Sequence, residues 1–173
     1  MKSLVESVRK ALESENWHGA LFIAITLPDI CGKIDKENMT SRKRYVNWFD
    51  KYLRDTYVKR VGSEKEEFVF LSGDDLYALR CAMLHEGSTI IDGQSARDVL
   101  NNFEFSWNSS HLNFLSKNYY SGKNRLVLNV GKFCEEICSG VEKWMDTTNY
   151  FEATNLVIRT APFTVDGITF GGN

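Results

Sequence analysis

The chain has 173 residues, a length at which a single domain buries roughly 70% of its unfolded surface without needing disulfides or structural metals. Hydrophobic residues make up 43% of the sequence, charged residues make up 25%, and there are two prolines, which excludes disordered, collagen-like and coiled-coil proteins. Lys and Arg number 21 against 23 Asp and Glu. Because these charges nearly balance, any site for a polyanion must be a local patch.

The cysteines and the N-terminal sequence predict a cytoplasmic protein. Cys31, Cys81, Cys134 and Cys138 form no Cys-x-x-Cys pair, and the chain starts with a charged, helical sequence rather than a signal peptide. The most apolar stretch, residues 19–27, is shorter than the ~20 residues that cross a bilayer. Cys134 and Cys138 share a helical face without a nearby His, so we expect core packing, with no metal site, no cofactor and no membrane association.

Helical periodicity predicts three helices in the first part of the chain. The first covers residues 3–14, and the second covers about 17–33 with a kink or break near Thr26 and Leu27, because Pro28 removes a backbone hydrogen bond. Thr40 is a good N-cap for the third. Its apolar stripe is predicted to continue through Tyr45, Trp48, Phe49, Tyr52, Leu53 and Thr56.

The segment 42–60 is basic within an acidic protein, because seven Lys and Arg residues oppose two Asp residues. Such an asymmetry is typical of a surface that binds a polyanion. The alternative is a solvated helix face whose charge is compensated by Glu64, Glu66 and Glu67. Under the first interpretation, the RNA-binding residues are Arg42, Lys43, Arg44, Lys51 and Arg54.

A helix over residues 73–86 carries the most informative pattern. Ser72 and Asp75 form a start similar to a capping box, and Gly87 is a natural stop. Arg80 falls within the apolar stripe of this helix, between Leu76 and Leu84. Since an unpaired buried charge is very unfavourable, Arg80 has to be paired, reach into a cleft or face a ligand anion.

The opposite face of the same helix is formed by small residues and a histidine. Small side chains let a second backbone approach closely, so we predict a twofold dimer with Ala78, Cys81 and Ala82 near its axis. Such a contact is expected to bury at least ~1,000 Å². His85 would then lie at the contact, and two copies of the helix would bring two arginines and two histidines to one groove.

Strands are expected later in the chain. We predict one domain over 1–173, with a helical core at about 1–95 and 129–147 and strands within about 99–128 and 154–170. The strand signals are the alternation of Phe103, Phe105 and Trp107, the apolar runs at 126–128 and 156–158, and a hairpin of 163–165 with 168–170 around Asp166-Gly167.

The string LYALRCAMLHEG, residues 76–87, contains an Arg-x4-His motif on a capped helix. In this respect the chain resembles the HEPN superfamily of helical domains, over roughly residues 1–147. The resemblance implies a mainly α fold, a HEPN-like helical bundle with a small late β element, α+β overall. It also implies a homodimer formed through the motif helices and a metal-independent endoribonuclease of a toxin or phage-defence system. Arg80 and His85 would be the catalytic residues, RNA the substrate, and an antitoxin or defence-system protein a further partner.

The implied chemistry suits the two residue types. A histidine can take the proton of an RNA 2′-hydroxyl or give one to the leaving 5′-oxygen, while an arginine stabilises the charge on the phosphorus. An alternative is a catalytically inactive HEPN-like module that binds RNA, a nucleotide or a protein partner. Active members often have Asn, Asp or His after the motif arginine, where this chain has Cys81. A third interpretation is structural, in which His85 bonds a carbonyl at the helix end.

Overall fold

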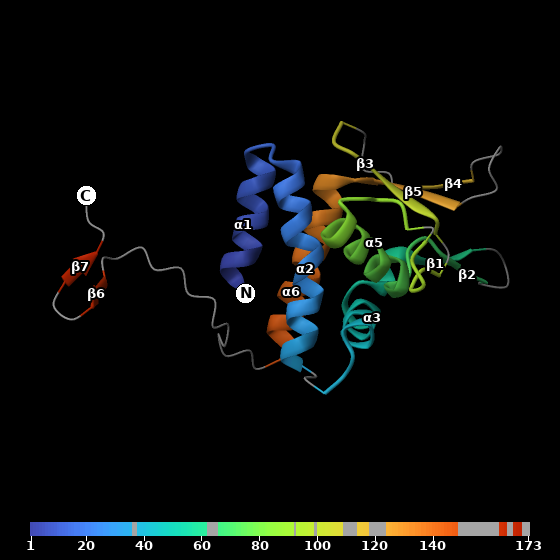
Figure 1. Cartoon of the computed structure of the whole chain (residues 1–173). Helices are drawn as coiled ribbons and strands as arrows, with labels where there is room; N and C mark the ends of the chain where they lie inside the picture. Colours follow the sequence, from blue (N-terminus) through green and yellow to red (C-terminus); the bar gives the residue numbers. More distant parts are fainter. Residues whose placement is uncertain are drawn as a thin grey trace.

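The computed structural model describes residues 1–35, 38–61, 66–91, 93–98, 100–108, 114–117, 124–148, 163–165 and 168–170. Within these ranges the chain forms six helices and seven short strands (Figure 1). The prediction of a mainly α fold with a small β element is confirmed.

Helix α2 (Trp17–Asp35) is the central element of the helical part. It packs against α1 (Lys2–Glu13), α3 (Ser41–Tyr52), α5 (Gly73–Glu86) and α6 (Val130–Thr147) (Figure 1). A helix that is apolar on most sides is stable in water only when neighbours cover it. This arrangement provides that cover, since α2 buries Ala20, Leu21, Ala24, Ile25, Leu27 and Cys31.

Pro28 does not interrupt α2. The helix continues from Trp17 to Asp35 with the proline inside it and buried. The missing proline N–H costs one backbone hydrogen bond, but packing against four other helices holds the segment helical on both sides. Of the kink or break that the sequence predicts near Thr26 and Leu27, the break is absent, because Pro28 lies inside one continuous helix.

The helix ends follow the predicted capping residues. The side chains of Thr40 and Ser72 each accept a hydrogen bond from the backbone N–H three residues later, at the starts of α3 and α5. Helix α5 ends at Gly87, whose φ of 62° lies in the left-handed region that glycine adopts without strain. Asn129 caps α6 in the same way as Thr40 and Ser72, although the sequence reasoning did not single it out.

Helix α3 is shorter than its apolar stripe predicts. It ends at Tyr52, and a single turn, α4 (Arg54–Tyr57), leads into an antiparallel hairpin of β1 (Val58–Val61) and β2 (Glu66–Val69). The prediction that helix continues through Thr56 as one element is wrong. Residues that favour strands come directly after α4. Val58, Val61 and Val69 are β-branched and fit a paired strand better than a helix.

The second sheet packs beside the start of α6. Its strands are β3 (Asn102–Ser106), β4 (Phe114–Lys117) and β5 (Asn124–Asn129), in the order β3-β5-β4. Strand β5 is parallel to β3 and antiparallel to β4, and it runs directly into α6. The strands predicted around Phe103 and around 126–128 are thereby confirmed.

The predicted C-terminal hairpin is also present, since β6 (Phe163–Val165) pairs antiparallel with β7 (Ile168–Phe170). The strand predicted at 156–158 lies outside the described residues.

The core is apolar and rich in aromatic side chains. Trp144, Tyr45, Tyr57, Phe49, Phe103 and Phe133 are among its largest fully buried members. Cys134 and Cys138 belong to it as predicted, and burial raises the pKa of each thiol to about 12. In the described ranges no helix is long and apolar enough to span a membrane.

A buried carboxylate attaches the segment after α5 to the start of that helix. Asp75 is fully buried, and one of its oxygens accepts hydrogen bonds from the backbone N–H groups of Asp98, at 2.8 Å, and Leu100, at 3.1 Å. The other oxygen accepts from the Ser72 hydroxyl at 2.7 Å. The sequence predicted only the capping role of Asp75, because the distant N–H groups become neighbours through the fold.

We predict that Asp75→Ala lowers the free energy of unfolding by about 2–4 kcal/mol, because it leaves buried N–H groups without an acceptor. The matched control is Asp74→Ala, which removes a surface pair with Arg42 and should cost less than about 1 kcal/mol. Urea unfolding followed by circular dichroism measures both values. Equal losses in the two variants would contradict the anchoring role of Asp75.

Candidate functional site

Helix α5 leaves one narrow strip of its surface open. Tyr77, Arg80 and Cys81 are partly exposed, and Leu84 and His85 are exposed. The remaining sides are covered, since Leu76, Ala78, Leu79, Ala82 and Met83 are buried within the chain. Arg80 and His85 therefore lie at the two edges of this open side, about 140° apart around the helix axis.

The small residues of α5 pack inside the chain rather than at its surface. Ala78 and Ala82 have no exposed area, so they cannot contact a second copy, and their predicted place at a dimer axis is wrong. Their size instead lets other segments of the same chain approach α5. Of the three predicted interface residues, Cys81 alone keeps partial exposure, beside Leu84.

Arg80 is held by an ion pair with α2. Its Nη2 donates to the Asp29 Oδ2 at 2.8 Å, and the two side chains are 20% and 19% exposed. The sequence required a partner, a cleft or a ligand for this arginine, and the structure supplies the partner. Asp29 was not predicted, because it lies 51 residues away in the sequence.

The Asp29 carboxylate also binds groups from α3. Its Oδ1 accepts a hydrogen bond from the Ser41 hydroxyl at 3.0 Å and lies 3.9 Å from the Arg44 Nη2. Arg44 also donates to the Met39 carbonyl. Two guanidinium groups thus share one carboxylate, which leaves the cluster with excess positive charge.

The guanidinium of Arg80 is not fully satisfied by this pair. Its Nε is buried and has no hydrogen-bond partner within the described residues. Burial by itself would lower the pKa of Arg80, but Asp29 and a hydrogen bond with Cys81 outweigh it, so the pKa is raised. Arg80 is therefore a permanent cation whose buried Nε–H has no partner among the described residues.

His85 lies in the last turn of α5, two residues before Gly87. It is exposed, and it makes no hydrogen bond or ion pair with another described residue, so the interpretation in which it bonds a terminal carbonyl finds no support. Five residues separate it from Arg80, a rise of about 7.5 Å. Within one chain Arg80 turns toward Asp29, and no hydrogen bond joins it to His85.

The basic residues of α3 and α4 are largely paired within the chain. Arg42 Nε binds the Asp74 carboxylate of α5 at 2.7 Å, and Arg54 Nη2 binds the Glu67 carboxylate of β2 at 2.6 Å. Glu67 is one of the compensating residues that the alternative interpretation named. Of the predicted RNA-binding residues, only Lys43 and Lys51 form no ion pair with another described residue.

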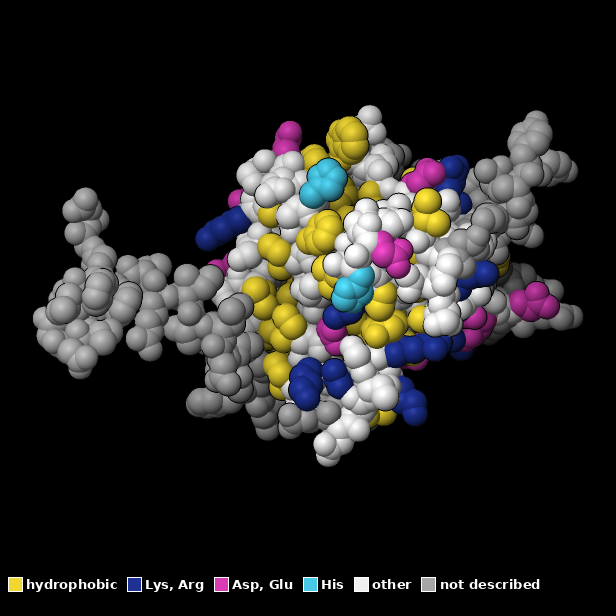
Figure 2. Space-filling view, viewed as in Figure 1, with side chains coloured by type: hydrophobic (Ala, Val, Ile, Leu, Met, Phe, Trp, Pro, Cys, Tyr) yellow, Lys and Arg dark blue, Asp and Glu magenta, His cyan; other side chains and the backbone are white. Residues whose placement is uncertain are grey.

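Figure 2 shows histidine side chains on one face among exposed hydrophobic ones, with Lys and Arg side chains gathered along its lower edge.

An apolar cavity of about 280 Å³ lies between α2, α5 and β3. Its lining includes Trp17, Phe22, Met83, Phe105 and Trp107. In the described ranges no group of three His, Cys, Asp or Glu residues could hold a metal ion.

Comparison with protein-family models finds no match for the chain, and neither do comparisons with curated proteins and with solved structures. The function of the chain is therefore inferred from the geometry of α5 and its neighbours and from the Arg80-x4-His85 motif.

We predict that Asp29 and Arg80 are energetically coupled. A double-mutant cycle of Asp29→Ala and Arg80→Ala should give a coupling energy of roughly 1–3 kcal/mol in urea unfolding, because each single variant leaves a half-buried charge without its partner. The exposed pair of Arg54 and Glu67 serves as the control, and its smaller coupling should decline as salt is added. A coupling near zero at Asp29 and Arg80 would show that the pair does not hold α5 to α2.

Proposed function

We propose that the protein is a metal-independent endoribonuclease of a toxin or phage-defence type. The observation that carries the proposal is the exposed strip of α5, on which Arg80 is a fixed cation and His85 is an accessible histidine that no other described residue binds. Both belong to the motif that resembles the HEPN superfamily, and they supply the two chemical functions that RNA cleavage needs.

The reaction follows from these functions. His85 takes the proton of a 2′-hydroxyl, whose oxygen attacks the neighbouring phosphorus, and the bond from phosphorus to the 5′-oxygen breaks. A protonated histidine gives its proton to that 5′-oxygen. Arg80 stabilises the charge on the phosphoryl oxygens. The products are a 2′,3′-cyclic phosphate and a 5′-hydroxyl.

Asp29 acts in this proposal as a positioning residue. It fixes the guanidinium of Arg80 at the surface of α5, and it removes part of the charge that Arg80 offers to a phosphate. Arg44 offsets this loss, because it adds a second cation to the same carboxylate. The cluster therefore favours a polyanion.

A second copy of the chain would complete the site. No hydrogen bond joins Arg80 to His85 within one protomer. Two α5 helices packed through Cys81 and Leu84 would bring two arginines and two histidines together. A twofold contact of this kind is the commonest form of homo-oligomer. The cytoplasmic location and an antitoxin or defence-system partner belong to the same proposal and rest on the resemblance.

The second candidate function is a HEPN-like module without catalytic activity that binds RNA, a nucleotide or a protein partner. Two observations favour it. Cys81 occupies a position that is often polar in active members, and Arg80 already has a carboxylate partner in Asp29. In this case Arg80 contributes to binding, and no cleavage follows.

We predict that the purified protein cleaves single-stranded RNA in the presence of EDTA. His85→Ala and Arg80→Ala should each reduce the cleavage rate at least ~100-fold, because general acid–base catalysis typically contributes 10²- to 10⁴-fold. His18→Ala is the matched control and should retain the wild-type rate. The products should carry 2′,3′-cyclic phosphate ends, and DNA of the same sequence should remain intact because it lacks the 2′-hydroxyl.

Activity that EDTA abolishes, or that survives both substitutions on α5, would refute the assignment. Absence of cleavage together with RNA binding that depends on Arg80 would establish the second candidate instead.

We predict that the chain is a dimer at tens of micromolar and that Leu84→Asp converts it to a monomer, because a charge at an apolar contact is unfavourable. Light scattering measures the mass. The control is Ile34→Asp on α2. The Ile34 side chain is 41% exposed, similar to Leu84 at 36%. A monomeric wild type, or a dimer that tolerates Leu84→Asp, would exclude this contact.

A further inference from the structure

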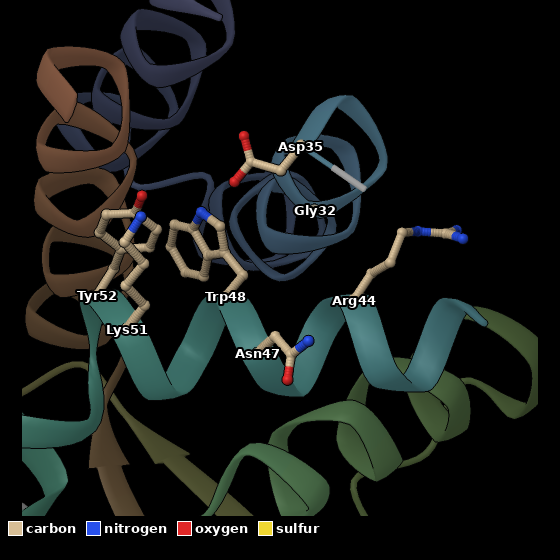
Figure 3. A pocket seen from close by; sticks show the side chains of 7 residues that line it. All are labelled: Gly32, Asp35, Arg44, Asn47, Trp48, Lys51 and Tyr52. Atoms are coloured by element: carbon tan, nitrogen blue, oxygen red, sulfur yellow. The ribbon is translucent and has the colours of Figure 1, made fainter. Parts of the chain in front are cut away.

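A second site lies between the C-terminal turn of α2 and the side of α3 that faces it. There the structure contains a cavity of about 120 Å³ that opens to solvent. Gly32 and Asp35 of α2 line it, together with Trp48 and Lys51 of α3 (Figure 3). No part of the proposed cleavage reaction uses this cavity.

Trp48 lines the cavity and carries a donor that is not satisfied within the described residues. Its side chain is 2% exposed, and its indole Nε1 is buried with no hydrogen-bond partner among the residues that the structure describes. Buried polar groups in proteins are nearly always hydrogen-bonded. An unpaired N–H beside a cavity is a donor that a water molecule or a ligand acceptor can satisfy.

Asp35 provides an acceptor on the other side of the same space. Its carboxylate and the Trp48 indole nitrogen point toward the same part of the cavity (Figure 3). The Oδ1 accepts from the Trp144 indole N–H at 2.9 Å, and that bond leaves Oδ2 for a second donor. The cavity therefore offers one fixed donor and one fixed acceptor.

These groups disfavour a simple anion next to Trp48 and Asp35, while the cations Arg44 and Lys51 line other parts of the cavity. The Asp35 carboxylate repels negative charge, and the C-terminal end of α2 carries the negative end of the helix dipole. A ligand must present an acceptor to Trp48 and a donor to Asp35 at the same time. The carbonyl and ring N–H of a nitrogen heterocycle have this arrangement.

The size of the cavity limits the ligand further. A cavity of roughly 150 Å³ in another protein holds one benzene molecule. A cavity of about 120 Å³ is therefore too small to enclose a fused purine, and a single six-membered ring would project partly through its open side. Lys51 is exposed beside it, with its Nζ 4.9 Å from the centre of the Tyr52 ring. An ammonium group at this position can pair with a phosphate that remains outside.

We propose that this cavity binds the pyrimidine base of a nucleotide. A base carbonyl accepts from Trp48 Nε1, the ring N–H of uracil donates to Asp35, and Lys51 pairs with the phosphate. The base can belong to a free nucleotide or to an unpaired residue of RNA. The RNA source rests on the proposed function, whereas the free nucleotide does not.

Isothermal titration calorimetry with uridine 5′-monophosphate tests the proposal. The wild type should bind one molecule per chain, and adenosine 5′-monophosphate should bind at least about tenfold more weakly. Trp48→Phe, which removes the N–H and retains a ring, should weaken uridine monophosphate binding at least about fivefold, the equivalent of one hydrogen bond. The control is Trp107→Phe, because Trp107 is 66% exposed and does not line this cavity.

Asp35→Asn keeps the proposal testable if Trp48→Phe does not fold. The asparagine oxygen can still accept from Trp144, but its NH2 group then faces the ring N–H, so binding should fall at least about tenfold. Absence of saturable binding by the wild type overturns the proposal. Binding that neither variant weakens overturns it as well.

Oligouridine distinguishes the two sources of the base. If Trp48→Phe weakens oligouridine and uridine monophosphate alike, the cavity takes a base of an RNA strand, and if only the mononucleotide binds, the ligand is a free nucleotide. The cleavage assay in EDTA keeps this proposal separate from the proposed function. Cleavage without uridine monophosphate binding would refute only the proposed base-binding site. Binding without cleavage would refute only the proposed endoribonuclease activity.

Discussion

The carboxylate of Asp29 fixes how three helices meet. It belongs to α2, it receives a 2.8 Å hydrogen bond from Arg80 of α5, and it binds Ser41 and Arg44 of α3. A carboxylate in a mostly apolar helix is unfavourable unless it is paired and hydrogen-bonded, so these partners and the packing of α2 require one another. The motif helix α5 takes its orientation from this junction.

The same junction connects the two sites that we propose. Asp29 and Asp35 lie on opposite sides of Gly32 along α2, and α3 approaches α2 closely at that glycine. A Cβ at Gly32 would lie 3.0 Å from the Arg44 carbonyl oxygen, a distance that would force α3 to move. Arg44 lines the cavity beside Trp48 and also pairs with Asp29. A ligand that moved α3 would therefore act on the partners of Arg80.

The helix ends predicted from the sequence are confirmed where the signal depends only on neighbouring residues. Thr40, Ser72 and Gly87 mark the helix ends that the structure has, since capping involves residues within one turn. Predictions from the sequence are wrong where packing against distant residues overrides a local preference. Pro28 does not break α2, against which four helices pack, and Ala78 and Ala82 face their own chain rather than a partner.

The sequence by itself determined the helical character of the chain, the late strands and the place of Arg80 and His85 on one capped helix, because periodicity and capping act over a few residues. It also established that Arg80 must be paired, reach into a cleft or face a ligand anion, since a buried charge is unfavourable alone. Only the tertiary structure decided that this partner is Asp29, that Asp75 anchors the segment around Leu100, and that Trp48 faces Asp35 across a cavity. These pairs join residues far apart along the chain, and sequence spacing carries no information about which distant groups the packing of α2 brings together.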